Sequence, residues 1–282
     1  MNRNEVKERG TPDFPFELYK VDRAHPRYEM AMHWHGDTEF IRVISGELTI
    51  ILDNRHYLAK SGDVFIVNPE TMHGAIPHDS VYECIVFRLD FLKTGNAECD
   101  AFIDSLTGGS TLIDEQVAQG DAMCAVTAMF NALRERGEGY RFRVIASLMT
   151  LLAAVREQGL YSSADERKNE REENNVRKLK RAVAYIRERY NEEITLDDIA
   201  ASTGFSTKYF CSFFRRMTDK TPIEYLNSYR IEKAARRLLS TDDSVTEIAY
   251  STGFNDLSYF IKTFKMVKGT TPNTYRKTGK SI

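Results

Sequence analysis

The stretch IAASTGF at residues 199–205 recurs as IAYSTGF at residues 248–254, 49 positions further along the chain. The repeat continues beyond each glycine with an offset of 50 positions, where Tyr209, Phe210, Phe214, Thr221, Pro222 and Tyr225 recur as Tyr259, Phe260, Phe264, Thr271, Pro272 and Tyr275. Each copy has the pattern of a short helix, a glycine that lets the backbone turn, and a second helix, which is a helix-turn-helix motif. Two such motifs in one small domain predict binding to DNA.

Charge is divided unevenly along the chain. Residues 176–282 carry 20 Lys+Arg and 12 Asp+Glu, a net charge of +8, whereas residues 1–175 carry 19 and 29, a net charge of −10. A basic C-terminal domain joined to an acidic N-terminal one is expected if only the basic domain contacts phosphates. A basic face that is merely solvated would not explain the segregation.

Length and cysteine usage limit the class of protein. A chain of 282 residues favours two domains. The four cysteines, which are Cys84, Cys99, Cys124 and Cys211, have no Cys-x-x-Cys spacing, so we expect neither a zinc-finger site nor a disulfide framework. The first ten residues lack an apolar core, and the longest apolar run, residues 144–155, is too short for a membrane span. These features predict a cytoplasmic protein that is neither exported nor membrane-spanning.

The pattern of apolar residues predicts a multidomain α+β protein. Short apolar runs such as 40–44 and 48–52, separated by turn residues, predict a small β-barrel or sandwich. Helical spacing at 114–134 and 140–156 predicts an antiparallel helical pair, which either packs on its own barrel or forms a dimer. We expect four consecutive parts: the barrel at 1–95, the helical packing or dimerisation region at 96–160, a linker without a hydrophobic run at 161–175, and the double helix-turn-helix domain at 176–282.

Each motif copy is predicted to begin with a capped helix. Thr195 with Asp198, and Ser244 with Glu247, have the spacing of an N-cap residue and the third helical residue. The second helices bury phenylalanines on one face and leave another face for the major groove. That DNA-facing set is Lys208, Cys211, Ser212 and Arg215 in copy one, and Leu257, Ser258, Ile261 and Lys262 in copy two; the turns are Gly204-Phe205 and Gly253-Phe254.

The segment between the two copies predicts a rigid helix. Thr221-Pro222 places a cap before a proline at the first helical position, and the helix continues to about Leu239 with interleaved basic residues. For both copies to contact one face of a duplex, their second helices must lie about one helical turn, roughly 34 Å, apart. A fixed joining helix makes a protein dimer unnecessary and predicts non-palindromic half-sites.

At these residues the chain resembles the AraC/XylS family of bacterial transcription regulators. The resemblance covers residues 176–278, with both Gly-Phe turns, Tyr229-Arg230-Ile231, and the closing Thr271-Pro272-x-x-Tyr275-Arg276. It implies base recognition by the faces named above, nearby phosphate contacts, and control of transcription initiation with RNA polymerase as a partner. Copy one departs from the more common pattern because Cys211 and Ser212 replace longer polar side chains, which predicts weaker or water-mediated contacts.

The predicted barrel carries a second motif pair. The spacing His-x-His-x3-Glu-x6-Gly, from His33 to Gly46, and Gly-x6-Pro-x3-His, from Gly62 to His73, resembles the two cupin motifs. In metal-binding cupins these positions hold one Mn, Fe, Ni or Zn ion, so the resemblance implies the ligands His33, His35, Glu39 and His73. The residue types suit such an ion, and His33 and His35 share one side of a strand. The alternative is a motif remnant without an ion, whose histidines hydrogen-bond an effector or one another.

We therefore predict a sequence-specific transcription regulator, not an enzyme, controlled by a small effector such as a sugar in the cupin-like barrel. The predicted effector-binding residues are His33, Trp34, His35, Glu39 and His73, with Tyr28, Phe40, Tyr57 and Phe65 as aromatic lining or core residues. Two other classes remain open. A cupin enzyme would need bound metal and turnover, and an architectural DNA protein would bind without sequence preference.

Overall fold

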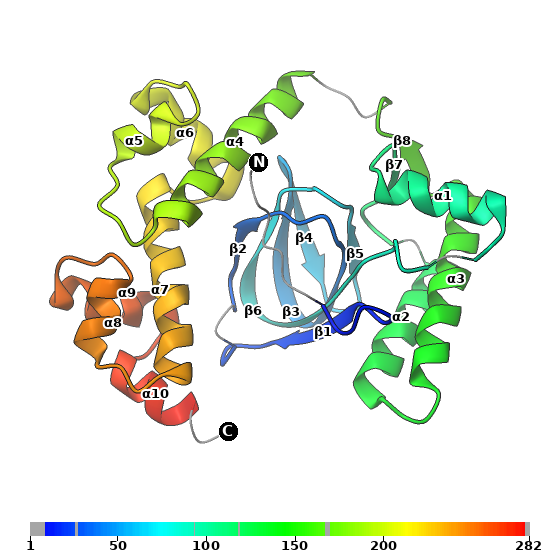
Figure 1. The fold of residues 1–282 in the computed structure, drawn as a ribbon, viewed down its shortest axis with the longest axis horizontal. Helices are drawn as coiled ribbons and strands as arrows, with labels where there is room; N and C mark the ends of the chain where they lie inside the picture. Colours follow the sequence, from blue (N-terminus) through cyan, green and yellow to red (C-terminus); the bar gives the residue numbers. More distant parts are fainter. Residues whose placement is uncertain (1–8, 26–27, 93, 118, 167–169, 280–282) are drawn as a thin grey trace. The chain divides into compact units, whose positions relative to one another are not determined.

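The computed structural model describes residues 9–25, 28–92, 94–117, 119–166 and 170–279. The chain forms two compact units, residues 1–25 with 34–173 and residues 26–33 with 174–282. The first unit combines a sheet with helices, and the second is mainly helical (Figure 1). The predicted multidomain α+β fold is confirmed.

The sheet is built on two antiparallel strands of 15 residues, β3 (Thr38–Leu52) and β6 (His73–Phe87). The shorter strands pair with these two: β1 (Phe16–Val21) and β2 (Met30–His33) with β6, and β4 (Arg55–Lys60) and β5 (Val64–Val67) with β3. The register of β3 against β6 shifts around Gly46, whose φ is +73°. A Cβ at Gly46 would lie 2.4 Å from the carbonyl oxygen of Asp79, so only glycine fits this bulge.

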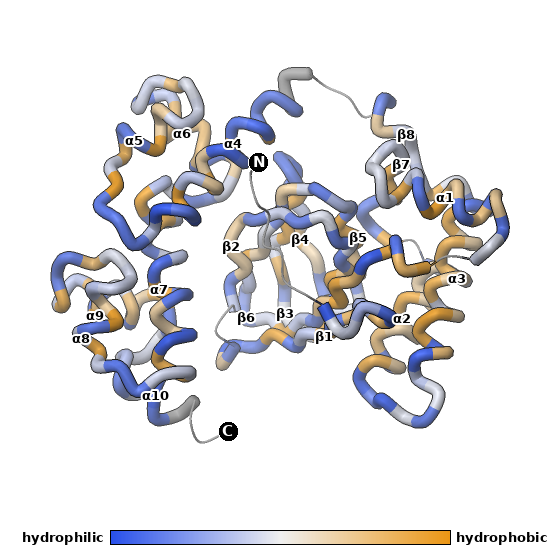
Figure 2. The backbone as a smooth tube through the Cα atoms, viewed as in Figure 1, coloured by the Kyte–Doolittle hydropathy of each residue, from blue (hydrophilic) through white to orange (hydrophobic). Residues whose placement is uncertain are grey.

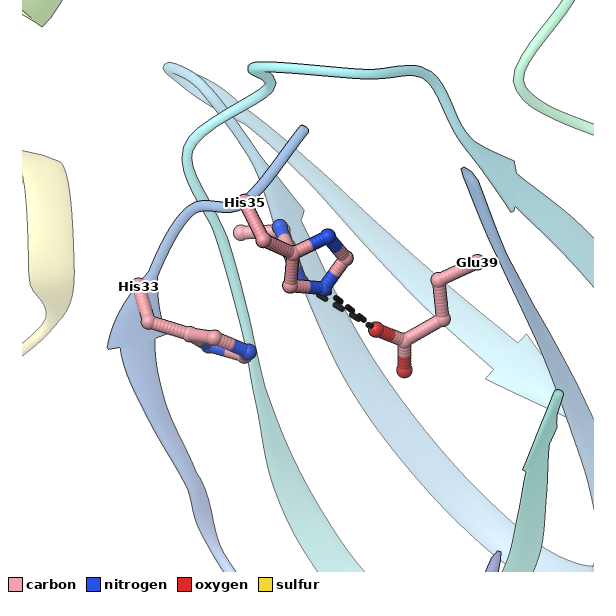
Figure 3. A group of neighbouring side chains, drawn as sticks. His33, His35 and Glu39 are labelled. Carbon is pink, nitrogen blue, oxygen red and sulfur yellow. Dashed lines mark hydrogen bonds and ion pairs between the residues drawn. The ribbon is translucent and has the colours of Figure 1, made fainter. Parts of the chain in front are cut away.

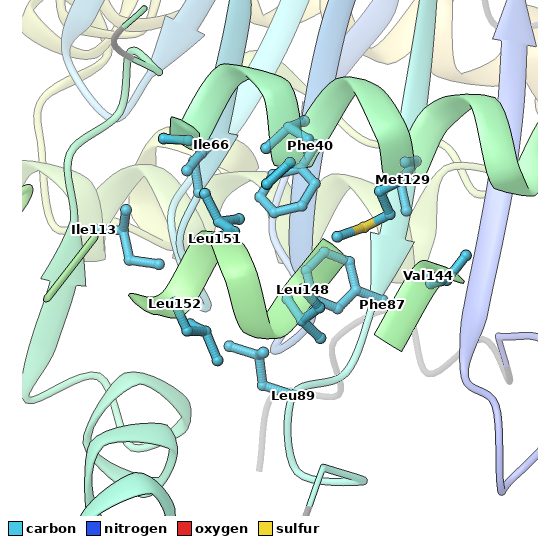
Figure 4. Close-up of a cluster of buried hydrophobic side chains, with 14 of the residues drawn as sticks. Phe40, Ile66, Phe87, Leu89, Ile113, Met129, Val144, Leu148, Leu151 and Leu152 are labelled. Atoms are coloured by element: carbon cyan, nitrogen blue, oxygen red, sulfur yellow. The ribbon is translucent and has the colours of Figure 1, made fainter. Parts of the chain in front are cut away.

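Two helices cover one face of the sheet. The antiparallel pair α2 (Asp121–Glu135) and α3 (Tyr140–Gln158) packs its apolar stripes onto sheet residues. This core contains Phe40, Ile66 and Phe87 from the strands and Met129, Leu148 and Leu151 from the helices (Figure 4). The stripes that suggested a dimer are thus buried inside the unit itself.

The first predicted helix begins later than expected. Residues 111–113 form strand β7 (Thr111–Ile113), and the chain then runs along the edge of β5, where the amide of Ile66 donates to the carbonyl of Glu115. The Glu115 carboxylate accepts from Arg55 and from the hydroxyl of Tyr57, at 2.6 Å for the tyrosine. These bonds hold the segment extended although its apolar spacing is helical. Before β7 lies α1 (Ala97–Thr107), capped by Asn96.

Much of the range expected to be a linker is ordered. Strand β8 (Tyr161–Ser163) pairs with β7, and α4 (Glu170–Arg189) begins within the range. Backbone pairing holds β8 despite its polar composition, and α4 is anchored further along by the buried Leu179, Val183 and Ile186. Beyond its grey first residues, the N-terminal half of α4 is strongly hydrophilic (Figure 2), which explains why a linker was expected here. Residues 167–169 of the expected linker lie outside the described residues.

The second unit contains the repeated motif. Copy one is α5 (Leu196–Ala201) with α6 (Thr207–Thr218), copy two is α8 (Val245–Ser251) with α9 (Leu257–Lys268), α7 (Pro222–Ser240) joins them, and α10 (Pro272–Gly279) follows. Ile231, Ala234 and Leu238 of α7 share a buried core with Phe260 and Phe264 of α9. Among the described residues, none of the helices has the length and apolar character needed to cross a membrane.

Candidate functional site

The helix starts of both copies have the predicted caps. The hydroxyl of Thr195 accepts from the amide of Asp198 at 3.2 Å, and the Asp198 carboxylate accepts from the Thr195 amide at 2.8 Å. Ser244 and Glu247 form the same reciprocal pair at 3.1 and 2.8 Å. These capping boxes satisfy amides that a helix start would leave unpaired, and they place a carboxylate at the positive end of the helix. The sequence prediction of both caps is confirmed.

The second helix of each copy presents the expected exposed face. Phe210, Phe213 and Phe214 of α6 and Phe260 and Phe264 of α9 are buried, and six of the eight predicted DNA-facing residues are exposed: Lys208, Ser212, Arg215, Ser258, Ile261 and Lys262. Cys211 is half-buried. Leu257 differs from the expectation, because this first residue of α9 is half-buried and packs against the core of copy two. Its place in the core leaves Ser258, Ile261 and Lys262 as the accessible part of that helix.

The two turn glycines share a conformation but differ in their surroundings. Gly204 has a φ of +73° and Gly253 a φ of +89°, a region that side chains with a Cβ rarely adopt. A Cβ at Gly204 would meet nothing within 4 Å. A Cβ at Gly253 would lie 2.5 Å from the carbonyl oxygen of Tyr190 and 2.9 Å from Nε of Arg230. The turn of copy two is therefore sterically closed, whereas that of copy one is open.

The cupin-like motif residues converge on one point. His35 Nε2 lies 3.2 Å and His73 Nε2 lies 3.3 Å from the same oxygen of Glu39, and the two imidazole rings are 4.8 Å apart. With His33, one candidate ligand atom from each of the four residues lies within 4.8 Å of the others. Figure 3 shows His33 and His35 directed toward the Glu39 carboxylate. The structure thus brings together all four residues named from the sequence spacing.

Backbone carbonyls set the proton position on each imidazole. Nδ1 of His33 lies 3.0 Å from the carbonyl of Ala31, and His35 Nδ1 is 3.0 Å from the carbonyl of Asp37. His73 repeats the arrangement with the carbonyl of Thr71 at 2.8 Å. A carbonyl only accepts, so each Nδ1 carries the proton and donates it. In the neutral state each Nε2 then presents a lone pair to the cluster, which is the tautomer a metal ion requires.

A buried carboxylate completes the cluster. Burial alone would raise the pKa of Glu39, but hydrogen bonds and charge from His35 and His73 hold that pKa well below its usual value. Cys84 lies beside it, and burial, followed by the charge of Glu39 and a hydrogen bond to it, raises the pKa of the thiol well above its usual value. Cys84 therefore remains a thiol that donates to the Glu39 carboxylate.

The donor set fits a divalent first-row metal. Three imidazole nitrogens and one carboxylate oxygen are the ligands that such ions prefer. Bonds of about 2.1 Å place ligand atoms no more than about 4.2 Å apart across an ion. The largest separation here, 4.8 Å, is slightly wider, so the side chains would close by about half an ångström around an ion.

The predicted aromatic lining divides between the two faces of the sheet. Trp34 is buried, with 6% of its surface exposed. Phe65 pairs with Ile41, and Val67 pairs with Glu39, so Phe65 and Val67 lie on the same face of the sheet as the cluster. The ring of Tyr57 is 5.2 Å from that of Phe65. Phe40 alternates to the opposite face and belongs to the core under α2 and α3. Phe40 is therefore a core residue, which is the second of the two roles left open for it.

The contacts of two residues near the sites, Cys84 and Arg230, were not predicted from the sequence. Cys84 came next to Glu39 through the register of β3 and β6, which pairs it with Ile41. Arg230 was one of several basic residues on the joining helix, yet it is 9% exposed and bonds two backbone carbonyls. Its position between Tyr229 and Ile231, both buried, was the available signal.

Comparisons with known proteins agree with this architecture. Residues 16–152 match the model of the AraC-like ligand binding domain, and residues 199–278 match that of a helix-turn-helix domain. The chain is 26% identical over 285 residues to the uncharacterized HTH-type transcriptional regulator YdeC of Bacillus subtilis, covering 98% of this chain and 96% of the relative. It is 22% identical to the melibiose operon regulatory protein of Escherichia coli K12, covering 93% and 88%.

Among solved structures, the DNA-binding domain of AdpA, a global transcriptional factor in complex with a target DNA, is 29% identical to this chain with a TM-score of 0.35, covering 36% of this chain and 93% of that one. The two matched domains together span most of the chain, in the order that the sheet and the helical repeat occupy. The relatives named here are transcriptional regulators. The chain belongs to the AraC family of helix-turn-helix transcriptional regulators, with a ligand-binding domain that precedes a DNA-binding domain.

Proposed function

We propose that a small effector bound at the cluster of His33, His35, Glu39 and His73 controls how the two helix-turn-helix copies engage DNA. Convergence of three carbonyl-oriented imidazoles on one buried carboxylate carries the proposal. Such a polar cluster is costly to bury unless protons, a cation or a ligand compensate it. The effector acts by population shift. The change that it causes in the free energy of DNA binding is therefore limited to the difference between its binding free energies for the DNA-competent arrangement and for the other arrangements.

The ion that this cluster suits is Mn, Fe, Ni or Zn. Such a cation would take the place of the Nε2 contacts that His35 and His73 make to the Glu39 carboxylate, and it would supply a Lewis acid for effector oxygens. His33, His35 and His73 would hold it through Nε2 and Glu39 through its carboxylate. The thiol of Cys84 would keep that carboxylate oriented.

A sugar is the effector class that we propose. Vicinal hydroxyls chelate or hydrogen-bond to a histidine–carboxylate centre, and aromatic faces such as those of Trp34 and Tyr57 stack on sugar rings. The name of one relative, the melibiose operon regulatory protein, supports this class. Sequence-specific control through RNA polymerase is the expected output, and enzymatic turnover is not part of the proposal.

The test combines metal content with ligand response. Full-length protein without a His tag, purified without chelator, is expected to contain about one first-row metal ion per chain, and Glu39→Gln is expected to contain much less. Metal addition to stripped protein should raise the melting temperature and change the emission of Trp34, the single tryptophan. Sugars are then titrated against the same emission and against binding to selected operator DNA.

His78→Gln is the matched control, because His78 is exposed and bonds Thr49 away from the cluster. It should keep the metal content and the melting shift of the wild type. Absence of stoichiometric metal, with no shift on adding any of the four ions, contradicts the metal site. If sugars also leave Trp34 emission and DNA affinity unchanged, the sugar proposal fails as well.

We further propose that the regulator forms a homodimer through α3. The buried stripes of α2 and α3 are occupied by the sheet, so the support comes instead from Phe142, which is 82% exposed on α3. Aromatic residues are enriched in the cores of protein interfaces, so the exposed ring of Phe142 is the anchor that such an interface would use.

A further inference from the structure

Helix α4 lies against the turns of both motif copies. Near its middle, the Nζ of Lys178 lies 3.7 Å from the centroid of the Phe205 ring, in the turn of copy one. Just beyond its end, the carbonyl of Tyr190 lies where a Cβ on Gly253 would reach, in the turn of copy two. About 17 Å of helix separates these two contacts. The length of this part of α4 therefore fixes the distance between the two turns.

Arg230 of the joining helix α7 holds the C-terminal end of α4 at the turn of copy two. Its Nε donates to the carbonyl of Tyr190 at 2.6 Å and its Nη2 donates to the carbonyl of Glu192 at 2.8 Å. These carbonyls directly follow α4, where the helix dipole favours a cation. The same guanidinium lies 5.7 Å from the ring centroid of Phe254, the residue after the glycine of copy two.

Neighbouring contacts give the junction a defined geometry. One turn before Arg230, the side-chain amide of Asn227 donates to the hydroxyl of Tyr259 on α9 at 2.9 Å. The Tyr190 ring packs 5.3 Å from that of Tyr229. The end of α4, the middle of α7 and the helices of copy two thus meet at Arg230, a residue that is 9% exposed.

We propose that Arg230 is a positioning residue that sets the separation of the two DNA-contacting helices and thereby the half-site spacing that this regulator accepts. The inference rests on DNA binding by both copies. Loss of the guanidinium leaves the carbonyls of the half-buried Tyr190 and the exposed Glu192 without their donors and releases the end of α4 from the turn of copy two. The second copy can then shift relative to the first, so the protein should bind its best spacing less tightly and tolerate other spacings better.

The test is a spacing scan on DNA. Duplexes selected from a random pool with the full-length wild type are rebuilt with one to five base pairs inserted or removed between the half-sites. Wild-type affinity should fall steeply as spacing changes, because five base pairs rotate one half-site about half a turn. Arg230→Gln should bind the selected duplex about tenfold more weakly, the loss expected for charged hydrogen bonds, and should show a flatter spacing profile.

Arg236→Gln is the matched control, because Arg236 lies on the same helix and pairs with Glu232 of that helix at 2.6 Å. It should keep the wild-type profile. Circular dichroism verifies folding, and Arg230→Lys, which keeps the charge, gives an intermediate profile if Arg230→Gln does not fold. Equal weakening at every spacing, or an unchanged profile in the folded variant, overturns the proposal. Selection of duplexes with one half-site only would instead contradict DNA engagement by both copies.

Discussion

Gly204 and Gly253 occupy equivalent positions in the repeat, yet a side chain would meet different neighbours at each. Both have positive φ, so each substitution carries the strain of a left-handed residue, about 1–2 kcal/mol. Only at Gly253 does the new Cβ also collide with a backbone oxygen, that of Tyr190, which cannot swing aside like a long side chain. The sequence repeat conceals this difference, because it arises from α4 and α7 rather than from the motif.

We therefore expect Gly253→Ala to destabilise the protein more than Gly204→Ala. The overpacking adds about 1–3 kcal/mol to the strain that both variants share. Urea unfolding of the two full-length variants measures the difference, and DNA binding by Gly253→Ala should fall with it. Equal losses of stability would contradict the closed turn of copy two.

At the scale of elements, Glu83 connects β6 with β3 and α2. Its carboxylate accepts from Arg42 at 2.7 Å and from Arg134 at 2.7 Å. Burial tends to raise the pKa of Glu83, but the hydrogen bonds and charges of Arg134 and Arg42 outweigh it and leave the pKa below its usual 4.5. Arg42 also stacks on Phe130 of α2, with 4.2 Å from Cζ to the ring centroid.

Loss of the Glu83 charge should therefore loosen α2 from the sheet. We expect Glu83→Gln to cost about 3 kcal/mol, because Arg42 stays buried without a counter-charge, whereas Arg134→Gln, at an exposed position, should cost under about 1 kcal/mol. Since the folded-state pKa is depressed, this stabilisation is present above about pH 4.5 and is lost as the pH falls through the folded value. Thermal unfolding from pH 7 to pH 3 tests this: the Glu83→Gln variant should lose less stability on acidification than the wild type.

Local signals predicted the elements whose stability is local. Both capping boxes followed from a hydroxyl and an acid three residues apart, and the motif turns from their glycines. The start of α2 was misplaced because bonds from Arg55 and Tyr57 hold Glu115 against the sheet across about sixty residues of sequence. Runs 40–44 and 48–52 form one strand, β3, because Gly46 lies in a bulge rather than a turn.

The candidate ligand cluster was predictable for a different reason. His33, His35 and Glu39 lie close in sequence, and His73 follows a recognisable spacing, so four residues sufficed without knowledge of the register. The place of Cys84 beside Glu39 depended on strand pairing, and that of Arg230 on how three helices meet. No local pattern encodes either contact.

At the scale of the whole molecule, the exposed Phe142 bears on self-association. We expect Phe142→Glu to weaken the homodimer at least tenfold, because it replaces a buried aromatic ring at the interface with a charge. Sedimentation equilibrium at micromolar concentration measures this, with and without operator DNA. Leu58→Glu, at a 56% exposed leucine of β4, is the control that should leave association unchanged.

A wild-type protein that remains monomeric under both conditions would rule out this interface. The opposite charges of the two halves of the chain, −10 and +8, also make association sensitive to salt, so the ionic strength has to be held constant in these measurements.

The three carbonyl bonds that orient His33, His35 and His73 have a consequence for how quickly and sharply the regulator responds. Because these imidazoles are already oriented for binding, the site needs no rearrangement when the effector binds, and little conformational entropy is lost. Its response threshold then depends on the chemistry of the cue and on its concentration in the cell rather than on slow refolding of the receptor. Selection could retune that threshold by changing the residues around the imidazoles while leaving their orientation intact.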